Sequence, residues 1–505
     1  MEKRKGMNHN TSLVQIIRRN KETYIVIFFM TVMSFFFMLK SPLHPWIGGD
    51  TGTDDSVFKM VALMMEKGYM PYRDSFDHKG PLLYILNWIG NKISSYSGIW
   101  VIEFLFMTGT FFMIYRISRL KCKINSSIIV TMFSISLLFE YFKEGNLTEE
   151  YAMLFIAIAL YIFLDYLLNQ KVTRFRLLIC GFSFGAVFLL RANMVPVWMV
   201  FCLFIFARTV VDKKWDALTQ FILWFMGGIC IIAVPILLWL AVNHSLSAFW
   251  ESYIVFNKVY VSVESKAFSG GRWNCFLSFF NTTVFLISFC AMAYMCIIRD
   301  KVINIVYMIY MLATLLLICM SGLPYNHYGM ILIPAFSYPM ASLFGEMEEM
   351  DSSKIAKIVA VVIKVYLLAN IILPKWLPII SSLPEVYESR EEEHKSELTR
   401  TVSSIIIDNT NTDDAISVYG NWDLIYILSN RRHATRYSYQ FPIGRVMPEI
   451  MEEYMRVLEE EEPKVIVIQE GRYDDNINGF ITNNNYHLTW SQYEDSTDGA
   501  LIYMK

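Results

Sequence analysis

Long, uninterrupted apolar blocks fill this 505-residue chain up to about residue 374. Hydrophobic residues make up 55% of the sequence, and they run together where a soluble protein would alternate them with polar residues at a helical or strand period. Because a helix needs about 20 apolar residues to cross the hydrocarbon of a bilayer, the blocks predict about eleven transmembrane helices. The expected spans are residues 23–42, 98–117, 126–142, 150–168, 176–192, 194–210, 217–242, 276–298, 302–320, 329–345 and 354–373.

The distribution of basic residues predicts how these spans are oriented. Lysines and arginines precede the first span and recur in alternate connections, whereas the connections near Glu144–Glu149 and Leu323–Tyr328 contain almost none. Basic residues favour the cytoplasmic side, so we expect the N-terminus in the cytoplasm. No small-x-small cleavage site follows the first span, which favours an uncleaved helix over a signal peptide. With an odd number of spans, the C-terminal tail lies outside the cytoplasm.

The composition changes sharply after the last apolar block, which predicts a second domain. Charges become dense, and no later run is long enough to cross a bilayer. Strand and helix patterns alternate along the tail, as in a small α/β domain. We therefore expect an all-α polytopic membrane domain over residues 1–374 and an extracytoplasmic α/β domain over 375–505. The expected elements of the tail are a solvated helix within Glu385–Glu397, strand Ala415–Tyr419, helix Asp423–Leu428, helix Pro448–Leu458, strand Lys464–Gln469 and a strand near Ala500–Met504.

Charge and cysteine content remove several classes of function. The net charge is −2, which gives no indication of nucleic-acid binding. The eight cysteines include no C-x-x-C pair, so the sequence supports neither a zinc site nor a disulfide framework.

The long polar loop expected over residues 42–97 gathers most of the candidate functional residues. After Asp54 and Asp55, apolar residues recur at helical spacing, which predicts an amphipathic helix in the membrane interface, ended by Gly68 and Pro71. A carboxylate held at a bilayer edge is often there for chemistry or transport. The charged and titratable residues of this loop include Asp50, Asp54, Asp55, Arg73, Asp74, Asp77, His78 and Lys79.

A second helix is expected to begin near Pro81, because proline suits the first helical turn. Lys79 would then lie just before a helix N-terminus. Free backbone N–H groups together with a cation form a good anion site, above all for phosphate.

Two shorter connections on the same side of the membrane add polar groups. Glu149 and Glu150 follow Thr148, which could cap the next helix, so a capping role for the two acids remains an alternative to a functional one. His327 and Tyr328 lie in the other connection, where tyrosine is also a normal interface residue. Arg191 ends an apolar block on this face against the positive-inside bias, which favours a role in binding an anion.

Four motifs resemble the polytopic, lipid-sugar-dependent glycosyltransferases of the GT-C class, especially bacterial relatives of the protein O-mannosyltransferases and aminoarabinose transferases. The tail segments Val418–Trp422 and Arg431–Tyr437 are also similar, so the resemblance covers almost the whole chain. The motifs are G-T-D-D-S-V-F at Gly52–Phe58, P-Y-R-D-S-F-D-H-K-G-P-L-L-Y at Pro71–Tyr84, G-N-L-T-E-E-Y at Gly145–Tyr151 and H-Y-G-M-I-L-I-P at His327–Pro334.

The resemblance implies an inverting transfer of a sugar from a polyprenyl-phosphate carrier to an extracytoplasmic acceptor, which could be a lipid, a protein or a cell-wall glycan. It implies that Asp54 is the catalytic base, with Asp55 as the alternative, and that Lys79 contacts the lipid phosphate. Arg191 would be a second cation. Such chemistry needs no nucleotide and no bound metal. The remaining candidate site residues are Arg73, Asp77, His78, Glu149, Glu150, His327 and Tyr328.

Other interpretations of the same residues remain open at this stage. Asp54 could cap a helix, Lys79 could be a snorkelling interface residue, and His327 could be a solvated loop residue. A lipid or polysaccharide transporter without bond chemistry would also need many spans and charged residues. Transporters, however, tend to place ionisable groups in discontinuous mid-membrane helices and to contain paired repeats. In this sequence the charges gather in the loops.

Overall fold

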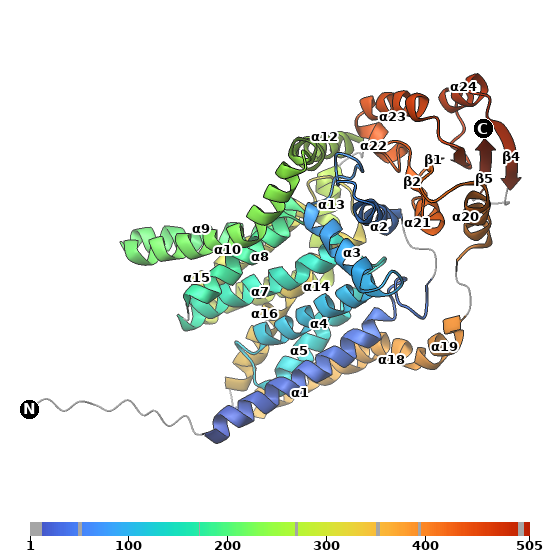
Figure 1. Ribbon diagram of the computed structural model, residues 1–505. Helices are drawn as coiled ribbons and strands as arrows, with labels where there is room; N and C mark the ends of the chain where they lie inside the picture. Colours follow the sequence, from blue (N-terminus) through green and yellow to red (C-terminus); the bar gives the residue numbers. More distant parts are fainter. Residues whose placement is uncertain are drawn as a thin grey trace, which may run out of the picture.

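A computed structural model describes residues 13–48, 53–170, 172–267, 271–349, 354–391, 395–492 and 499–505. Its larger part is a body of packed helices, and a smaller α/β unit stands at one end of it (Figure 1). The α-helices of the larger part are α1 (Leu13–Met38), α2 (Thr53–Glu66), α3 (Pro81–Ile93), α4 (Gly98–Ser118), α5 (Ile124–Ser136), α6 (Leu138–Tyr141), α7 (Thr148–Asn169), α8 (Arg174–Phe188), α9 (Pro196–Val211), α10 (Trp215–Val242), α11 (Leu246–Phe249), α12 (Asn257–Ala267), α13 (Gly271–Phe280), α14 (Thr283–Ile298), α15 (Lys301–Ile318), α16 (Ile333–Glu349), α17 (Lys354–Leu367), α18 (Leu373–Ser381) and α19 (Leu383–Glu388).

Short 3₁₀- and π-helical segments join several of these helices. They are η1 (Ala192–Met194), η2 (Trp250–Phe256), η3 (Asn326–Leu332), η4 (Leu368–Ile372) and η5 (Ser389–Glu391).

Seven helices within the described residues are long and apolar enough to cross a membrane. They match seven of the eleven expected spans, and an eighth expected span corresponds to α13 and α14, a pair bent by 71°. The other three expected spans fold as helices of only 15, 16 and 17 residues, namely α8, α9 and α16. The apolar blocks there continue into irregular backbone or 3₁₀ turns such as η1 and η3, which hydropathy alone does not distinguish from helix. The count of eleven is therefore not confirmed.

The last apolar helix does not stop at the boundary expected at residues 374 and 375. A helical segment from Lys357 to Glu388 is 32 residues long and includes α18 and α19. The helix expected within Glu385–Glu397 ends at Glu391 in η5, residues 392–394 lie outside the described part of the chain, and the next helix begins at Glu397.

The α/β unit is built on a five-stranded sheet with the strand order β2-β1-β3-β5-β4. Strand β1 runs parallel to β2 and β3, and β5 runs antiparallel to β3 and β4. Strands β1, β3 and β5, with α21 and α23, confirm the elements expected in the tail. The elements of this unit are α20 (Glu397–Asn409), β1 (Ala415–Tyr419), α21 (Leu424–Ser429), β2 (Arg432–His433), α22 (Phe441–Val446), α23 (Glu449–Glu461), β3 (Val465–Gln469), α24 (Asp475–Asn483), β4 (His487–Gln492) and β5 (Ala500–Met504).

Helix α2 packs between the helical body and the α/β unit, beside α3 and α21 (Figure 1). Met60 and Met64 on one face belong to the hydrophobic core of the α/β unit. Val57, Phe58 and Val61 belong to the core of the helical body. The sequence predicted an amphipathic helix with its apolar face in the membrane interface. Its apolar residues instead join the two parts of the protein, because both provide apolar partners for it.

Helix α2 ends and helix α3 begins where glycine and proline in the sequence predicted. Helix α2 ends at Glu66, and Gly68 follows with a φ of +90°, a backbone conformation that glycine adopts without steric cost. Pro81 occupies the first turn of α3, with Gly80 as its N-cap. The connecting segment 67–80 therefore lies between two fixed helices.

Candidate functional site

A cavity of about 680 Å³ lies where the loop after α2, several helix ends of the body and the α/β unit meet. Eight of the eleven residues expected in the site line it. They are Asp54, Asp77, His78, Lys79, Glu149, Arg191, His327 and Tyr328. The tertiary structure therefore brings together four segments that are distant in the sequence.

Asp54 lies in the first turn of α2 with its side chain exposed to this cavity. Its carboxylate makes no hydrogen bond or ion pair with any described residue. A carboxylate on a cavity wall that no described residue engages is free to accept a proton from a bound molecule.

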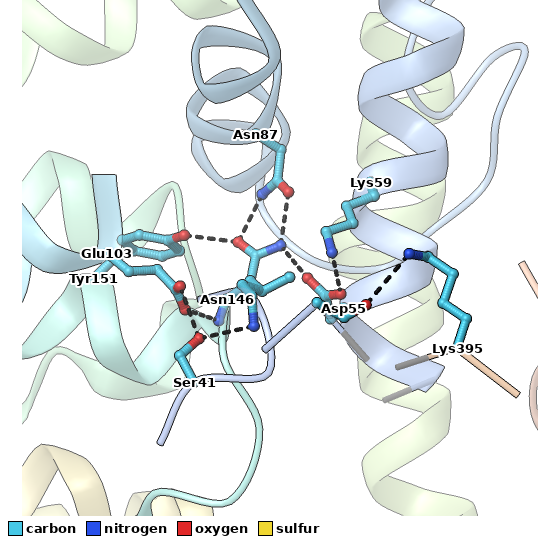
Figure 2. Close-up of polar contacts among 10 residues, drawn as sticks. Ser41, Asp55, Lys59, Asn87, Glu103, Asn146, Tyr151 and Lys395 are labelled. Carbon is cyan, nitrogen blue, oxygen red and sulfur yellow. Dashed lines mark hydrogen bonds and ion pairs between the residues drawn. The ribbon is translucent and has the colours of Figure 1, made fainter. Parts of the chain in front are cut away.

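Asp55 does not line the cavity, and its side chain is buried among the polar contacts of Figure 2. Its Oδ1 accepts a hydrogen bond of 2.8 Å from Asn146 Nδ2, and its Oδ2 lies 2.8 Å from the ammonium of Lys59. Successive residues of a helix point about 100° apart, and of these two acids only Asp54 lines the cavity. The expected alternative base is therefore already engaged in structural contacts.

Asn146 is the centre of a buried polar network around the start of α2 (Figure 2). It exchanges hydrogen bonds of 2.7 and 2.9 Å with Asn87, and its Oδ1 accepts a bond of 2.7 Å from Tyr151. Its backbone N–H donates to Glu103, which also accepts from Ser41. The network connects α2 to α3, α4 and α7, so the direction of Asp54 depends on four helices.

Asp77 has both carboxylate oxygens occupied. Tyr84 donates to Oδ2 at 2.7 Å, and Tyr439 of the α/β unit donates to Oδ1 at 2.9 Å. Burial opposes ionisation, but Lys79 and His78 outweigh it and lower the pKa of Asp77 well below its usual value. Asp77 is therefore an anion that joins the loop to the α/β unit.

Lys79 presents its ammonium group to the cavity. The Nζ atom lies 3.0 Å from His78 Nε2 and 5.6 Å from the centroid of the Phe58 ring. Burial and the neighbouring ammonium lower the pKa of His78, so its ring is neutral near pH 7 and can accept a hydrogen bond from Nζ. Among the described residues no carboxylate lies within 4 Å of this ammonium. Its charge is therefore available to an anionic ligand.

The backbone N–H groups at the start of α3 are not free, contrary to the expectation. Gly80 donates to the carbonyl of Leu190 at 3.0 Å, and Leu82 donates to that of Leu189 at 3.1 Å. Leu83 donates to Gly80, and Pro81 has no N–H group. The carbonyls of the two residues before Arg191 thus use the N–H groups at the start of α3. An anion bound here would have to be held by the Lys79 side chain.

Arg191 forms a second cationic group on the cavity wall. Its guanidinium is 2.5 Å from Glu149 Oε1 and donates to the Tyr328 hydroxyl at 2.9 Å. His327 packs edge-to-face on Tyr328 with 4.7 Å between ring centroids. Burial lowers the pKa of His327, so this ring is also neutral near pH 7.

Glu149 and Glu150 have different surroundings. Glu149 lines the cavity and pairs with Arg191, whereas Glu150 accepts a hydrogen bond of 3.3 Å from the backbone N–H of Leu147. Leu147 is the N-cap of α7, and the Thr148 hydroxyl donates to Glu149 at 2.9 Å. The expectation that Thr148 caps this helix was wrong, because α7 begins at Thr148 itself.

Arg73 and Glu150 are not brought to the cavity. Arg73 is exposed, 2.7 Å from Asp74 and 2.7 Å from the carbonyl of Asn243. Asp50 of the same polar loop lies outside the described residues. Among the described residues no group of three or more His, Cys, Asp or Glu side chains is arranged to hold a metal ion.

The α/β unit contributes a wall of the cavity that the sequence did not predict. Asn421, Asp423, Tyr439 and Arg445 line it. Asn421 was noted only within a motif, and Asp423 only as the start of a helix, because no periodicity marks them. Burial raises the pKa of Asp423 to about 7, and the negative charge of Asp77 adds to this.

Comparison of the sequence with models of protein families and with curated proteins gives no match. The fold, in contrast, is similar to solved structures. ArnT from Cupriavidus metallidurans bound to undecaprenyl phosphate matches 95% of this chain and 97% of its own with a TM-score of 0.55 and 11% identity. The apo state of the same protein matches over the same shares with a TM-score of 0.52 and 11% identity.

A third solved structure is the archaeal oligosaccharyltransferase AglB from Archaeoglobus fulgidus, in complex with an inhibitory peptide and a dolichol-phosphate. It matches 95% of this chain and 74% of its own, with 12% identity and a TM-score of 0.49. The resemblance to GT-C glycosyltransferases that the motifs predicted is confirmed at the level of the fold, since this chain shares the fold of ArnT over nearly the whole of both chains.

Proposed function

We propose that this protein is a membrane glycosyltransferase that transfers a sugar, with inversion, from a polyprenyl-phosphate carrier to an extracytoplasmic acceptor. One observation carries the proposal: a single cavity holds the carboxylate of Asp54, which pairs with none of the described residues, together with the cations Lys79 and Arg191. The first group can accept a proton, and the other two can neutralise a phosphate. A neighbour with the same fold binds undecaprenyl phosphate, which supports a lipid phosphate as the ligand.

The proposed reaction is a direct displacement at the anomeric carbon. Asp54 takes the proton from an acceptor O–H or N–H group while the acceptor atom forms a bond to the anomeric carbon. The bond between that carbon and the phosphate oxygen breaks, and its electron pair remains on the phosphate. Attack from the face opposite the leaving group inverts the configuration.

Each charged group has a separate part in this proposal. Lys79, free of a carboxylate partner within 4 Å, stabilises the negative charge that grows on the departing phosphate. Arg191 is held by Glu149 and Tyr328, so its guanidinium is fixed in direction and contributes positive potential without side-chain rearrangement. Asp77 and His78 hold the loop that positions Lys79.

The same proposal includes the location of the site. We infer that the cavity and the α/β unit lie on the extracytoplasmic side with the N-terminus in the cytoplasm, as the basic residues indicate. The acceptor would be a lipid, a protein or a cell-wall glycan. Membrane lipids surround the apolar helices.

A complementation experiment tests the function. Glycolipids and cell-wall polymers from a deletion strain would be compared by mass spectrometry after complementation with the wild-type gene or with Asp54→Asn. We expect one glycan substituent to be absent from the deletion strain, restored by the wild type and not by the variant. Restoration by an Asp54→Asn protein present at the wild-type level would reject Asp54 as the base, and identical glycans in all strains would reject the transfer itself.

A further inference from the structure

Two acceptor oxygens on the α/β wall of the cavity have no hydrogen-bond partner among the described residues. They are Asp423 Oδ1 and Asn421 Oδ1, and both atoms are buried. Asp423 as a whole is 1% exposed and lines the cavity. A buried acceptor without a donor costs free energy, so its persistence needs a reason other than stability.

Ser438 lies beside the Asp423 carboxylate, but Oδ1 of that carboxylate makes no hydrogen bond with a described residue. Asp423 is the N-cap residue of α21, a position where an aspartate usually accepts a hydrogen bond from a backbone N–H of the first turn, yet its side chain makes no such bond. Asn421 satisfies its backbone N–H through Gln469 at 2.9 Å, which leaves its side-chain oxygen unpaired.

Two neighbouring polar groups of the cavity, Asp77 and Tyr439, are already paired. Tyr439 donates to Asp77, and Asp77 receives a second bond from Tyr84. The Tyr439 hydroxyl therefore has no proton left to donate to the unpaired oxygens. A bound molecule that offers hydrogen-bond donors would complete them.

The two walls of the cavity differ in charge. Lys79 and Arg191 come from the helical body, while Asn421 and Asp423 of the α/β unit each present an acceptor oxygen without a partner among the described residues, and Arg445 of the same unit is paired with Glu264. A ligand with phosphate at one end and hydroxyl groups at the other matches both walls. A second acidic group on the hydroxyl-bearing part would be repelled by Asp423 and Asp77.

On the basis of the proposed function, we infer that Asp423 and Asn421 form the subsite that recognises the sugar of the lipid-linked donor, and that this sugar is polyhydroxylated and bears no acidic group. The α/β unit then binds the sugar and selects among sugars, and the helical body binds the phosphate. Affinity for the bare lipid phosphate would not depend on Asp423.

Direct binding to the full-length protein in lipid nanodiscs tests this division. The probes are undecaprenyl phosphate, the same lipid carrying glucose, galactose or mannose, and the same lipid carrying glucuronic acid. For the wild type we expect at least one neutral-sugar lipid to bind tenfold or more tightly than bare undecaprenyl phosphate, and the glucuronic acid lipid to bind more weakly than its neutral counterpart.

Two substitutions separate hydrogen bonding from charge. In Asp423→Leu the preference for the neutral-sugar lipid should fall to within about twofold of the bare lipid, whose own affinity should stay unchanged. With binding measured at pH 8.5, above the pKa of about 7 of Asp423, Asp423→Asn should weaken the rejection of the glucuronic acid lipid, because the repelling charge is gone while an acceptor oxygen remains. The control is Asp408→Leu, an exposed aspartate on α20 of the same unit, which should behave as the wild type.

Thermal stability distinguishes this recognition role from a purely structural role of Asp423, which would make Asp423→Leu melt at a lower temperature than the wild type. Asp423→Leu should melt no lower than the wild type, because it removes an unpaired buried acceptor. Wild-type affinities that are equal for all the probes, or a neutral-sugar preference that survives in Asp423→Leu, would overturn the subsite and leave the proposed function standing. A wild-type protein that binds no undecaprenyl phosphate at all would instead reject the proposed function, and the subsite with it.

Discussion

Asn146 donates a hydrogen bond of 2.8 Å to Asp55, and this contact fixes which of two adjacent acids faces the cavity. Asn146 has a φ of +63°, in the left-handed region that asparagine tolerates better than most residues. That conformation lets one side chain contact Asp55 of α2, Asn87 of α3 and Tyr151 of α7. With Asp55 held, the helical period directs Asp54 to the cavity.

Asp54→Asn should therefore mainly reduce activity, whereas Asp55→Asn should mainly reduce stability. Asp54 is exposed and unpaired, so its loss should leave the melting temperature unchanged while transfer falls by roughly 10²–10⁴-fold, the usual contribution of a general base. Asp55→Asn loses the ionic contact with Lys59 in a buried network and should lower stability by about 1–3 kcal/mol, with a smaller loss of activity. Melting curves and transfer rates of the two purified variants test this expectation. A larger loss of activity in Asp55→Asn than in Asp54→Asn would assign the base to Asp55.

Lys79→Ala should weaken use of the lipid donor. A hydrogen bond to a charged group contributes about 1.5–3 kcal/mol, so the apparent KM for the donor should rise by roughly 10- to 100-fold. Lys92→Ala provides the control, since this lysine lies in the last turn of α3, the helix that follows Lys79, with a side chain 56% exposed. An unchanged KM in Lys79→Ala would show that the phosphate is bound elsewhere.

His433 should make the protein sensitive to mild acid. Burial lowers its pKa to about 4, whereas an unfolded histidine has a pKa near 6.5. Between these values the unfolded chain binds a proton that the folded protein does not, so stability should fall as the pH is lowered from about 6.5 to 4, by on the order of 3 kcal/mol in total.

Melting temperatures from pH 7.5 down to 4.5 test this expectation in wild type and His433→Gln. The glutamine can still reach Ser75, which lies 3.1 Å from His433 Nε2, so the variant should show a shallower decline. His487→Gln, at an exposed position of β4, should keep the wild-type slope. Parallel curves for wild type and His433→Gln would contradict the assignment.

Met60→Ala should loosen the α/β unit from the helical body. Met60 is fully buried and belongs to the core of the α/β unit although it lies on α2. Truncation of a buried methionine costs about 2–5 kcal/mol, so we expect a lower melting temperature and faster proteolysis. Met199→Ala, on α9 with 54% exposure, is the matched control, and equal effects of the two substitutions would rule out this packing role.

The sequence predicted the elements that depend on local chemistry. Gly68 and Pro81 mark where α2 ends and α3 begins, since glycine adopts a positive φ without steric cost and proline alone lacks a backbone N–H group. The strands of the tail followed from short apolar runs between turns. The lengths of the helices were less predictable, because apolar residues such as Leu189 and Leu190 follow the end of α8 without being helical.

Which side chains meet was decided by packing. Residues as far apart as Asp54, Arg191, His327 and Asp423 share one cavity only because α2 is fixed between the helical body and the α/β unit. No local sequence pattern predicts that the carbonyls of Leu189 and Leu190 accept hydrogen bonds from the N–H groups at the start of α3. The sequence by itself determined the helices, their ends and the types of charge in each loop. Only the tertiary structure determined which charges remain unpaired, because a polar group is free or engaged according to neighbours that arrive from elsewhere in the chain.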